Sequence, residues 1–113
     1  MRVMARTTSF HLVSQSVPVT LQALGARLRE ARIRRKLRQS DVAQKLGFSR
    51  STINAVEHGS MTTAIGAYLA VLWVYGLDRE VSLLADPGLD REGLSLAFDI
   101  GEKRVRVDKK HVV

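Results

Sequence analysis

The stretch QSDVAQKLGFSRSTINAVEHG, residues 39–59, carries two short apolar patterns of helical spacing on either side of one glycine. In the first half, Val42, Ala43 and Leu46 recur at the spacing of one inward helical stripe. Gly47 follows directly, where a chain that leaves a helix often needs a residue with left-handed backbone angles. We therefore predict a first helix that ends at Leu46 and a tight turn at Gly47.

A second short helix is predicted to begin directly after this turn. The hydroxyl of Ser49 suits an N-cap, because it can accept a hydrogen bond from the backbone N–H of Ser51 or Thr52. Ile53 and Val56 give the new helix its inward face. The outward face consists of Arg50, Ser51, Asn54 and Ala55. Two helices in this order form a helix-turn-helix, whose second helix enters the major groove of DNA, so duplex DNA is the first partner to consider.

Over roughly residues 24–72, the chain resembles the Xre/Cro/CI family of bacterial and phage repressors. The residues that carry the resemblance, all in one register, are Arg32, Leu37, Gln39, Ala43, Gly47, Ser49, Ile53, Glu57 and Gly59. The resemblance implies an all-α fold, a five-helix lambda-repressor-like DNA-binding domain. One departure is Arg38, because a Thr or Asn cap commonly precedes the Gln in this family. Arg38 is expected to weaken the start of the helix and to add a phosphate contact.

The resemblance and the outward face together assign roles to individual side chains. The expected DNA phosphate contacts are Arg38, Gln39, Ser49 and Thr52. The expected base contacts are Arg50, Ser51, Asn54 and Ala55. Arg50 is the sharpest candidate, because a guanidinium can bind guanine O6 and N7 together. Ser51 and Asn54 are more permissive readers, and Ala55 offers only a methyl contact.

Glu57 has two interpretations. It could be a simple surface charge, but the family pairs this glutamate with the arginine seven residues before the Gln, which here is Arg32. The resemblance thus implies a structural ion pair that ties the second motif helix to the first helix of the domain. We expect no catalytic role for this carboxylate.

Composition is consistent with a polyanionic partner. The chain of 113 residues is 45% hydrophobic, which suits one small domain with appendages and a modest core that dimerisation would enlarge. Its formal net charge is +7. The excess lies in one block that contains Arg27, Arg29, Arg32, Arg34, Arg35, Lys36 and Arg38 against Glu30. About half of this block is expected to neutralise DNA phosphates, and the remainder to serve the helix dipole or face solvent.

Other classes of function find little support. The chain has no cysteine, and His11, His58 and His111 have no ligand spacing, so we expect neither a disulfide, a metal site nor a cofactor. Apolar runs are too short to span a membrane, and no cleavage pattern follows the N-terminus, which predicts a cytoplasmic, nucleoid-associated protein. No catalytic constellation is visible, so the chain is not expected to be an enzyme.

The chain is predicted to have three parts: residues 1–18, 19–85 and 86–113. The first is a flexible N-terminal arm or a short pairing strand. The second is the DNA-binding domain, whose first helix is expected to start after Thr20 as N-cap and to end near Lys36. The inward residues of that helix are Leu21, Leu24, Leu28 and Ala31.

The rest of the domain is predicted to be helical. Residues 62–75 are apolar nearly all round, which predicts a central core helix or a helix that also makes a dimer contact. The candidates for that contact are Tyr68, Leu72 and Trp73. Residues 76–84 predict a short fifth helix capped by Asp78, followed by a firm turn at residues 86–88.

The C-terminal extension allows several interpretations. Residues 89–98 favour one or two helical turns. Residues 104–107 alternate as a half-buried strand would, and a strand this short must pair with its symmetry mate, the N-terminal arm or another protein. The alternative is a disordered basic tail.

Three segments, residues 67–87, 91–98 and 103–107, resemble the C-terminal half of HipB-type antitoxins. The resemblance implies a homodimer that represses its own operon and binds a HipA-like serine/threonine kinase toxin. Trp73, Val105 and Val107 are the expected dimer or toxin contacts.

Two alternatives stay open. The first is a stand-alone phage-type or restriction-controller repressor without a toxin. The second is an RNA- or ribosome-associated protein, which is disfavoured because only 5% of the residues are aromatic and available for base stacking. Under both the antitoxin and the stand-alone repressor hypotheses, a dimer would place two recognition helices on an inverted-repeat operator, with half-sites about 34 to 36 Å apart.

Overall fold

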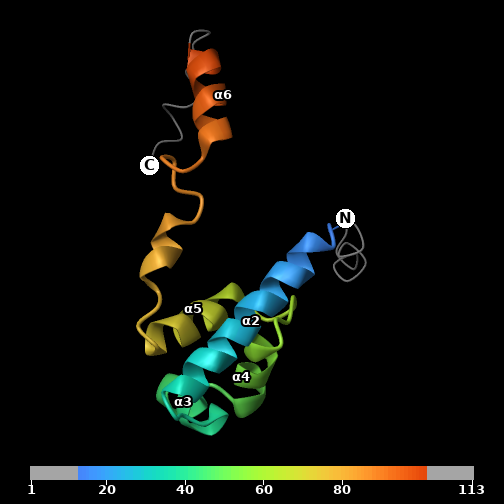
Figure 1. The fold of residues 1–113 in the computed structure, drawn as a ribbon, viewed down its shortest axis with the longest axis vertical. Helices are drawn as coiled ribbons and strands as arrows, with labels where there is room; N and C mark the ends of the chain where they lie inside the picture. Colours follow the sequence, from blue (N-terminus) through green and yellow to red (C-terminus); the bar gives the residue numbers. More distant parts are fainter. Residues whose placement is uncertain (1–12, 102–113) are drawn as a thin grey trace. The chain divides into compact units, whose positions relative to one another are not determined.

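The computed structural model describes residues 13–101, which are mostly helical (Figure 1). They fall into two compact units that divide after Asp78. The first unit contains α2 (Ser16–Arg34), α3 (Gln39–Leu46), α4 (Arg50–Glu57) and α5 (Ile65–Val74). The second contains the 3-10 helix η2 (Arg79–Leu83) and α6 (Arg91–Gly101). No strand occurs between residues 13 and 101, and the prediction of an all-α fold is confirmed.

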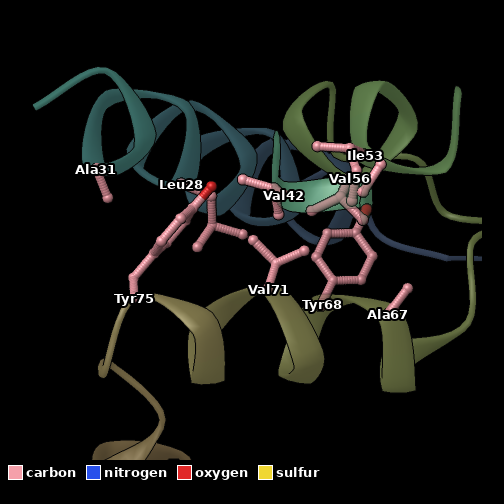
Figure 2. Close-up of a cluster of buried hydrophobic side chains, with 10 residues drawn as sticks. Leu28, Ala31, Val42, Ile53, Val56, Ala67, Tyr68, Val71 and Tyr75 are labelled. Carbon is pink, nitrogen blue, oxygen red and sulfur yellow. The ribbon is translucent and has the colours of Figure 1, made fainter. Parts of the chain in front are cut away.

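The core of the first unit lies where α4 packs against α2, α3 and α5, while α3 also packs against α5. Figure 2 shows side chains of α5 pointing into the layer formed by the other helices, with Val71 facing Val42 and Tyr68 facing Ile53 and Val56. The buried apolar residues are Leu28, Ala31, Val42, Ala43, Ile53, Val56, Ala67, Tyr68, Val71 and Tyr75. The inward face of α4 is thus fixed by packing, so its outward face has a defined orientation.

The turn of the motif follows the prediction in detail. Helix α3 ends at Leu46, and Gly47 has a φ of 72° in the left-handed region. The hydroxyl of Ser49 accepts a hydrogen bond from the Thr52 backbone N–H at 3.2 Å, which caps α4. A residue that the sequence analysis did not use, Phe48, packs against the core from within the turn.

The prediction that the first helix starts after Thr20 is wrong, because α2 begins at Ser16. Pro18 lies in the first turn of α2, where a missing backbone N–H removes no hydrogen bond of the helix. The Ser14 hydroxyl accepts from the Ser16 backbone N–H at 3.1 Å, and so satisfies one of the free donors at this end. The C-terminal end is at Arg34, close to the predicted Lys36.

Two glycines allow α2 to pass closely over the end of α4. A Cβ atom at Gly25 would lie 2.6 Å from the Val56 carbonyl oxygen and 2.7 Å from the Glu57 carbonyl oxygen. Gly59 has a φ of 69°, and a Cβ there would lie 2.5 Å from the Cα of Gln22. Both contacts are with backbone atoms, so neither position has room for a side chain.

Arg35 of the basic block is committed to the fold. Its guanidinium donates to the carbonyl oxygens of Ala31 at 3.0 Å and Tyr75 at 3.2 Å, and lies 5.4 Å from the centroid of the Tyr75 ring. Burial raises the pKa of Tyr75 to about 12. Arg35 therefore joins the C-terminal ends of α2 and α5, a role that the prediction for the basic block did not include.

The second unit contains the predicted turn. The Leu89 backbone N–H donates to the Asp86 carbonyl oxygen and the Gly88 N–H to the Asp86 carboxylate, both at 2.9 Å. The short helix before the turn is a 3-10 helix. Helix α6 runs over eleven residues and exceeds the one or two turns predicted for residues 89–98. The Asp90 carboxylate accepts from the Gly93 N–H at 2.9 Å and supports its start.

Several predictions concern residues outside the range 13–101. The predicted strand at residues 104–107, with Val105 and Val107, lies outside the described residues, as does most of the predicted N-terminal arm. Within residues 13–101, no helix has both the length and the apolar character needed to cross a membrane.

Candidate DNA interface

The N-terminal half of α4 presents polar side chains to solvent. Arg50, Ser51 and Asn54 are exposed, whereas Ala55 is half-buried. On the opposite side of the same helix Ile53 and Val56 are completely buried. The outward face predicted from the sequence is therefore the free face of α4, with Ala55 at its edge.

The Arg32–Glu57 ion pair expected from the family resemblance is present. Arg32 Nε donates to Glu57 Oε2 at 2.7 Å and Arg32 Nη2 donates to Glu57 Oε1 at 3.0 Å, a bidentate geometry. The Glu57 side chain is 1% exposed and that of Arg32 is 12% exposed. The hydrogen bond to Glu57 raises the pKa of Arg32 above its ordinary value. This pair joins α2 to the C-terminal end of α4.

Arg32 also binds the loop between α2 and α3. Its Nη1 atom donates to the Leu37 carbonyl oxygen at 2.9 Å. One guanidinium thus holds the end of α4 and the segment that leads into α3. The relative position of the two motif helices depends on it.

The side-chain amide of Gln39, a predicted phosphate contact, instead donates hydrogen bonds within the protein. Its Nε2 atom donates to Glu57 Oε1 at 3.0 Å and to Asn54 Oδ1 at 3.3 Å. Both hydrogens of the side-chain amide are therefore committed within the protein. The backbone N–H of Gln39, at the first position of α3, is the donor that suits a phosphate there.

Arg38 supplies no side-chain cap to α3, in line with its departure from the family pattern. The Asp41 carboxylate accepts from the Arg38 backbone N–H at 2.7 Å and from the Arg38 guanidinium at 3.1 and 3.2 Å. This is the reverse contact of a capping box: it satisfies the N–H of the N-cap residue, whereas the N–H groups of the first turn receive no acceptor from the Arg38 side chain. These hydrogen bonds, from the guanidinium first and the backbone N–H second, lower the pKa of Asp41.

A shallow depression of about 360 Å³ lies beside the start of α3. It is lined by Arg32, Arg38, Gln39, Ser40 and Arg50. Three arginines line the depression beside a helix N-terminus, a setting that attracts a phosphate, although the guanidinium groups of Arg32 and Arg38 are bound to Glu57 and Asp41. The structure thus groups two predicted phosphate contacts, Arg38 and Gln39, with the predicted base contact Arg50.

The other two predicted phosphate contacts form a hydroxyl cluster at the start of α4. Ser49 Oγ lies 2.9 Å from Thr52 Oγ1 and 3.1 Å from Ser51 Oγ. A second open depression, of about 550 Å³, is lined by Phe48, Ser51, Thr52, Ala55, Thr63, Ala64 and Ala67. Thr63, which the sequence did not single out, lines this depression together with residues of α4.

The remaining predicted contact, Trp73, lies on α5 and is 64% exposed. Ile65 on the same helix is 69% exposed. Helix α5 therefore has an apolar outer surface in addition to its core face. Tyr68, a predicted candidate for a dimer contact, is instead buried, and its hydroxyl donates to the Ser60 carbonyl oxygen at 2.7 Å.

Two short helices joined by a glycine turn, with a polar exposed N-terminus on the second, define a helix-turn-helix DNA-binding regulator. The chain matches the family model described as "Helix-turn-helix domain" over residues 23–84, more than half of its length, and it belongs to that family. This assignment supports the resemblance to Xre-like proteins. No curated protein and no solved structure matches the chain.

Proposed function

We propose that this protein is a sequence-specific transcriptional repressor that binds an inverted-repeat operator as a homodimer. Helix α4 would enter the major groove, with Arg50 directed at a guanine and Ser51, Asn54 and Ala55 beside it. The observation that carries this proposal is the exposed polar face of α4, which the buried Ile53 and Val56 hold next to a basic depression.

Phosphate contacts would flank the inserted helix on both sides. Arg38 and the backbone N–H of Gln39 would bind one phosphate at the start of α3, and the hydroxyls of Ser49 and Thr52 would bind another at the start of α4. Contacts of this kind set the position of a protein on the duplex but do not read sequence. The proposal thus separates the affinity of the domain from its specificity.

Replacing Arg50 with Ala is expected to weaken binding to the selected operator by about 1 to 3 kcal/mol and to relax specificity at one base pair per half-site. The physical reason is the loss of a bidentate contact with guanine. Operators would first be selected from random duplexes with the wild-type protein. Fluorescence anisotropy would then give affinities for a panel with each base pair replaced in turn.

Arg29→Ala is the matched control, because Arg29 is exposed on α2 and its replacement removes the same charge. It should leave the base preference intact. An unchanged preference in Arg50→Ala would show that Arg50 does not read a base.

Replacing Arg38 with Ala is expected to weaken binding to all sequences alike and to lower the salt slope of log K by about one unit. The paired variant Asp41→Asn should act in the opposite direction, because it releases the Arg38 guanidinium from a carboxylate. Affinities at several salt concentrations, on operator and on unrelated duplex, would measure both effects. A sequence-dependent loss in Arg38→Ala would assign Arg38 to base reading instead.

The finer function we propose is that of an antitoxin of a type II toxin-antitoxin system, which represses its own operon and binds a HipA-like kinase. The resemblance of residues 67–87 and 91–98 to HipB-type antitoxins supports this role. Exposed apolar side chains support it as well: Ile65 and Trp73 in the first unit, and Leu94 and Phe98 in the second. Residues 86–113 would serve dimerisation or toxin contact, with Val105 and Val107 in a pairing strand.

The test is capture of partners from the native host with the full chain as bait, followed by size-exclusion chromatography with light scattering, with and without operator DNA. Recovery of a HipA-like kinase encoded beside this gene would support the antitoxin role. A dimer that binds its own promoter and captures no kinase would favour the stand-alone repressor. A monomer that ignores duplex DNA would contradict both.

A further inference from the structure

A chain of hydrogen bonds runs from the buried ion pair to the exposed face of α4. Glu57 Oε1 accepts from Gln39 Nε2 at 3.0 Å, and the same nitrogen donates to Asn54 Oδ1 at 3.3 Å. The Glu57 end is buried and the Asn54 side chain is exposed. Gln39 thus connects a fixed internal charge with a side chain on the proposed base-reading surface.

The charge at the buried end determines which way both amides point. An ionised carboxylate can only accept hydrogen bonds, so the Gln39 group that faces Glu57 must be its NH2. The bidentate contact with Arg32 holds the carboxylate in place at 2.7 and 3.0 Å. Since the second hydrogen of the same NH2 is directed at Asn54, the Asn54 atom that faces Gln39 must be the oxygen.

This arrangement leaves the Asn54 amide nitrogen on the outward side. Within residues 13–101, Asn54 Nδ2 donates to no protein atom, so both of its hydrogens are available to a ligand. A free asparagine usually reads adenine, because it accepts from N6 and donates to N7 at the same time. Asn54 Oδ1 keeps a second lone pair, but the Gln39 hydrogen bond fixes the amide with this oxygen toward Gln39 and so favours donation by its NH2 group to a base.

We infer that Gln39 is a specificity-determining positioning residue, which turns Asn54 from an adenine reader into a donor that selects guanine. Guanine presents two acceptors, O6 and N7, in the major groove, whereas adenine presents one acceptor beside an N6 donor. Gln39 acts through Asn54 and does not itself touch the base. The inference rests on the proposed insertion of α4 into the major groove.

The experiment uses the panel of substituted operators and the full chain. Asn54→Ala identifies the base pair that Asn54 reads, as the position where discrimination is lost. At that pair the wild-type protein should prefer guanine to adenine by about tenfold. Gln39→Met, which has a side chain of similar length but no amide, should abolish this preference or shift it toward adenine while the Arg50 base pair keeps its preference.

A second variant leaves Gln39 and the ion pair intact. Asn54→Asp keeps an acceptor for the Gln39 NH2 but presents a carboxylate oxygen to the groove. It should lose the guanine preference at the same pair, with weaker overall affinity because the new charge repels phosphates. Gln44→Ala, an exposed change on α3 at a residue that lines neither depression, is the control and should leave every base preference unchanged.

The outcomes separate this inference from the proposed function. If the wild-type chain selects no duplex sequence, the proposed function fails and the inference fails with it. If it selects an operator and Arg50→Ala relaxes it, the inference alone is overturned by any of three results. These are no effect of Asn54→Ala at any pair, a wild-type preference for adenine at the Asn54 pair, or a uniform loss of affinity in Gln39→Met with its preferences retained.

Discussion

Arg32→Met is expected to lower the free energy of unfolding by about 3 to 5 kcal/mol. The change leaves the Glu57 carboxylate, whose side chain is 1% exposed, without its bidentate partner. It also removes the hydrogen bond from Arg32 Nη1 to the Leu37 carbonyl oxygen, at 2.9 Å. Urea unfolding followed by circular dichroism would measure the loss.

The physical reason is desolvation and not lost attraction. A buried charge that has lost its partner keeps the full cost of leaving water, whereas an apolar pair of similar volume has no such cost. The double variant Arg32→Met with Glu57→Leu should therefore recover most of the stability lost in Arg32→Met. Arg29→Met, at an exposed position of the same helix, should change stability by less than about 0.5 kcal/mol.

The double variant decides how the pair acts. If it is as unstable as Arg32→Met, the loss does not come from the unpaired carboxylate but from packing or from the Leu37 contact. The double variant would also remove the acceptor of the Gln39 amide, so its DNA specificity need not recover with its stability.

Gly25→Ala is expected to be the second severe change, with a loss of about 3 kcal/mol or more in the free energy of unfolding. An added Cβ would lie 2.6 to 2.8 Å from the Val56 and Glu57 carbonyl oxygens and the Gly59 backbone nitrogen. These are backbone atoms at the end of α4, and they cannot move aside as a side chain can. Relief would require α2 and α4 to separate, which would loosen the packing of Leu28, Ile53 and Val56.

Gly66→Ala is the matched control for this prediction. Gly66 lies in α5, and a Cβ there would have no atom within 4 Å. Alanine has the higher helix propensity, so this variant should be more stable by about 0.5 to 1 kcal/mol. Thermal and urea unfolding of both variants would test the pair. A stability of Gly25→Ala equal to or above that of the wild-type protein would contradict the close approach of α2 and α4.

Both predictions concern contacts between residues far apart in the chain, and they differ in how far the sequence anticipated them. The Arg32–Glu57 pair was expected only from the family resemblance, because nothing local indicates that residues 25 positions apart in the chain meet. The sequence does not indicate the role of Gly25, because a glycine within a helical pattern can either destabilise the helix or allow another segment to approach closely. The distances to Val56 and Glu57 decide for the close approach.

Two other features of the chain differ from the predictions for a similar reason. The N-terminal arm was predicted to extend to residue 18, but α2 begins at Ser16, because a proline is tolerated in the first turn of a helix. Tyr68 was a candidate for a dimer contact, but its hydroxyl and ring are used inside the domain. In both cases the surrounding structure decided the role of the residue.

The sequence by itself determined the elements of the motif: the end of α3 at Leu46, the left-handed turn at Gly47, the cap at Ser49 and the buried face of α4. These features depend on backbone angles and hydrogen bonds within a few residues, or on apolar spacing along one helix. Only the tertiary structure decided that α2 crosses α4 at Gly25, that Arg35 binds the end of α5, and that Gln39 links Glu57 to Asn54. Such contacts depend on how the helices cross, and the crossing results from packing the whole core at once.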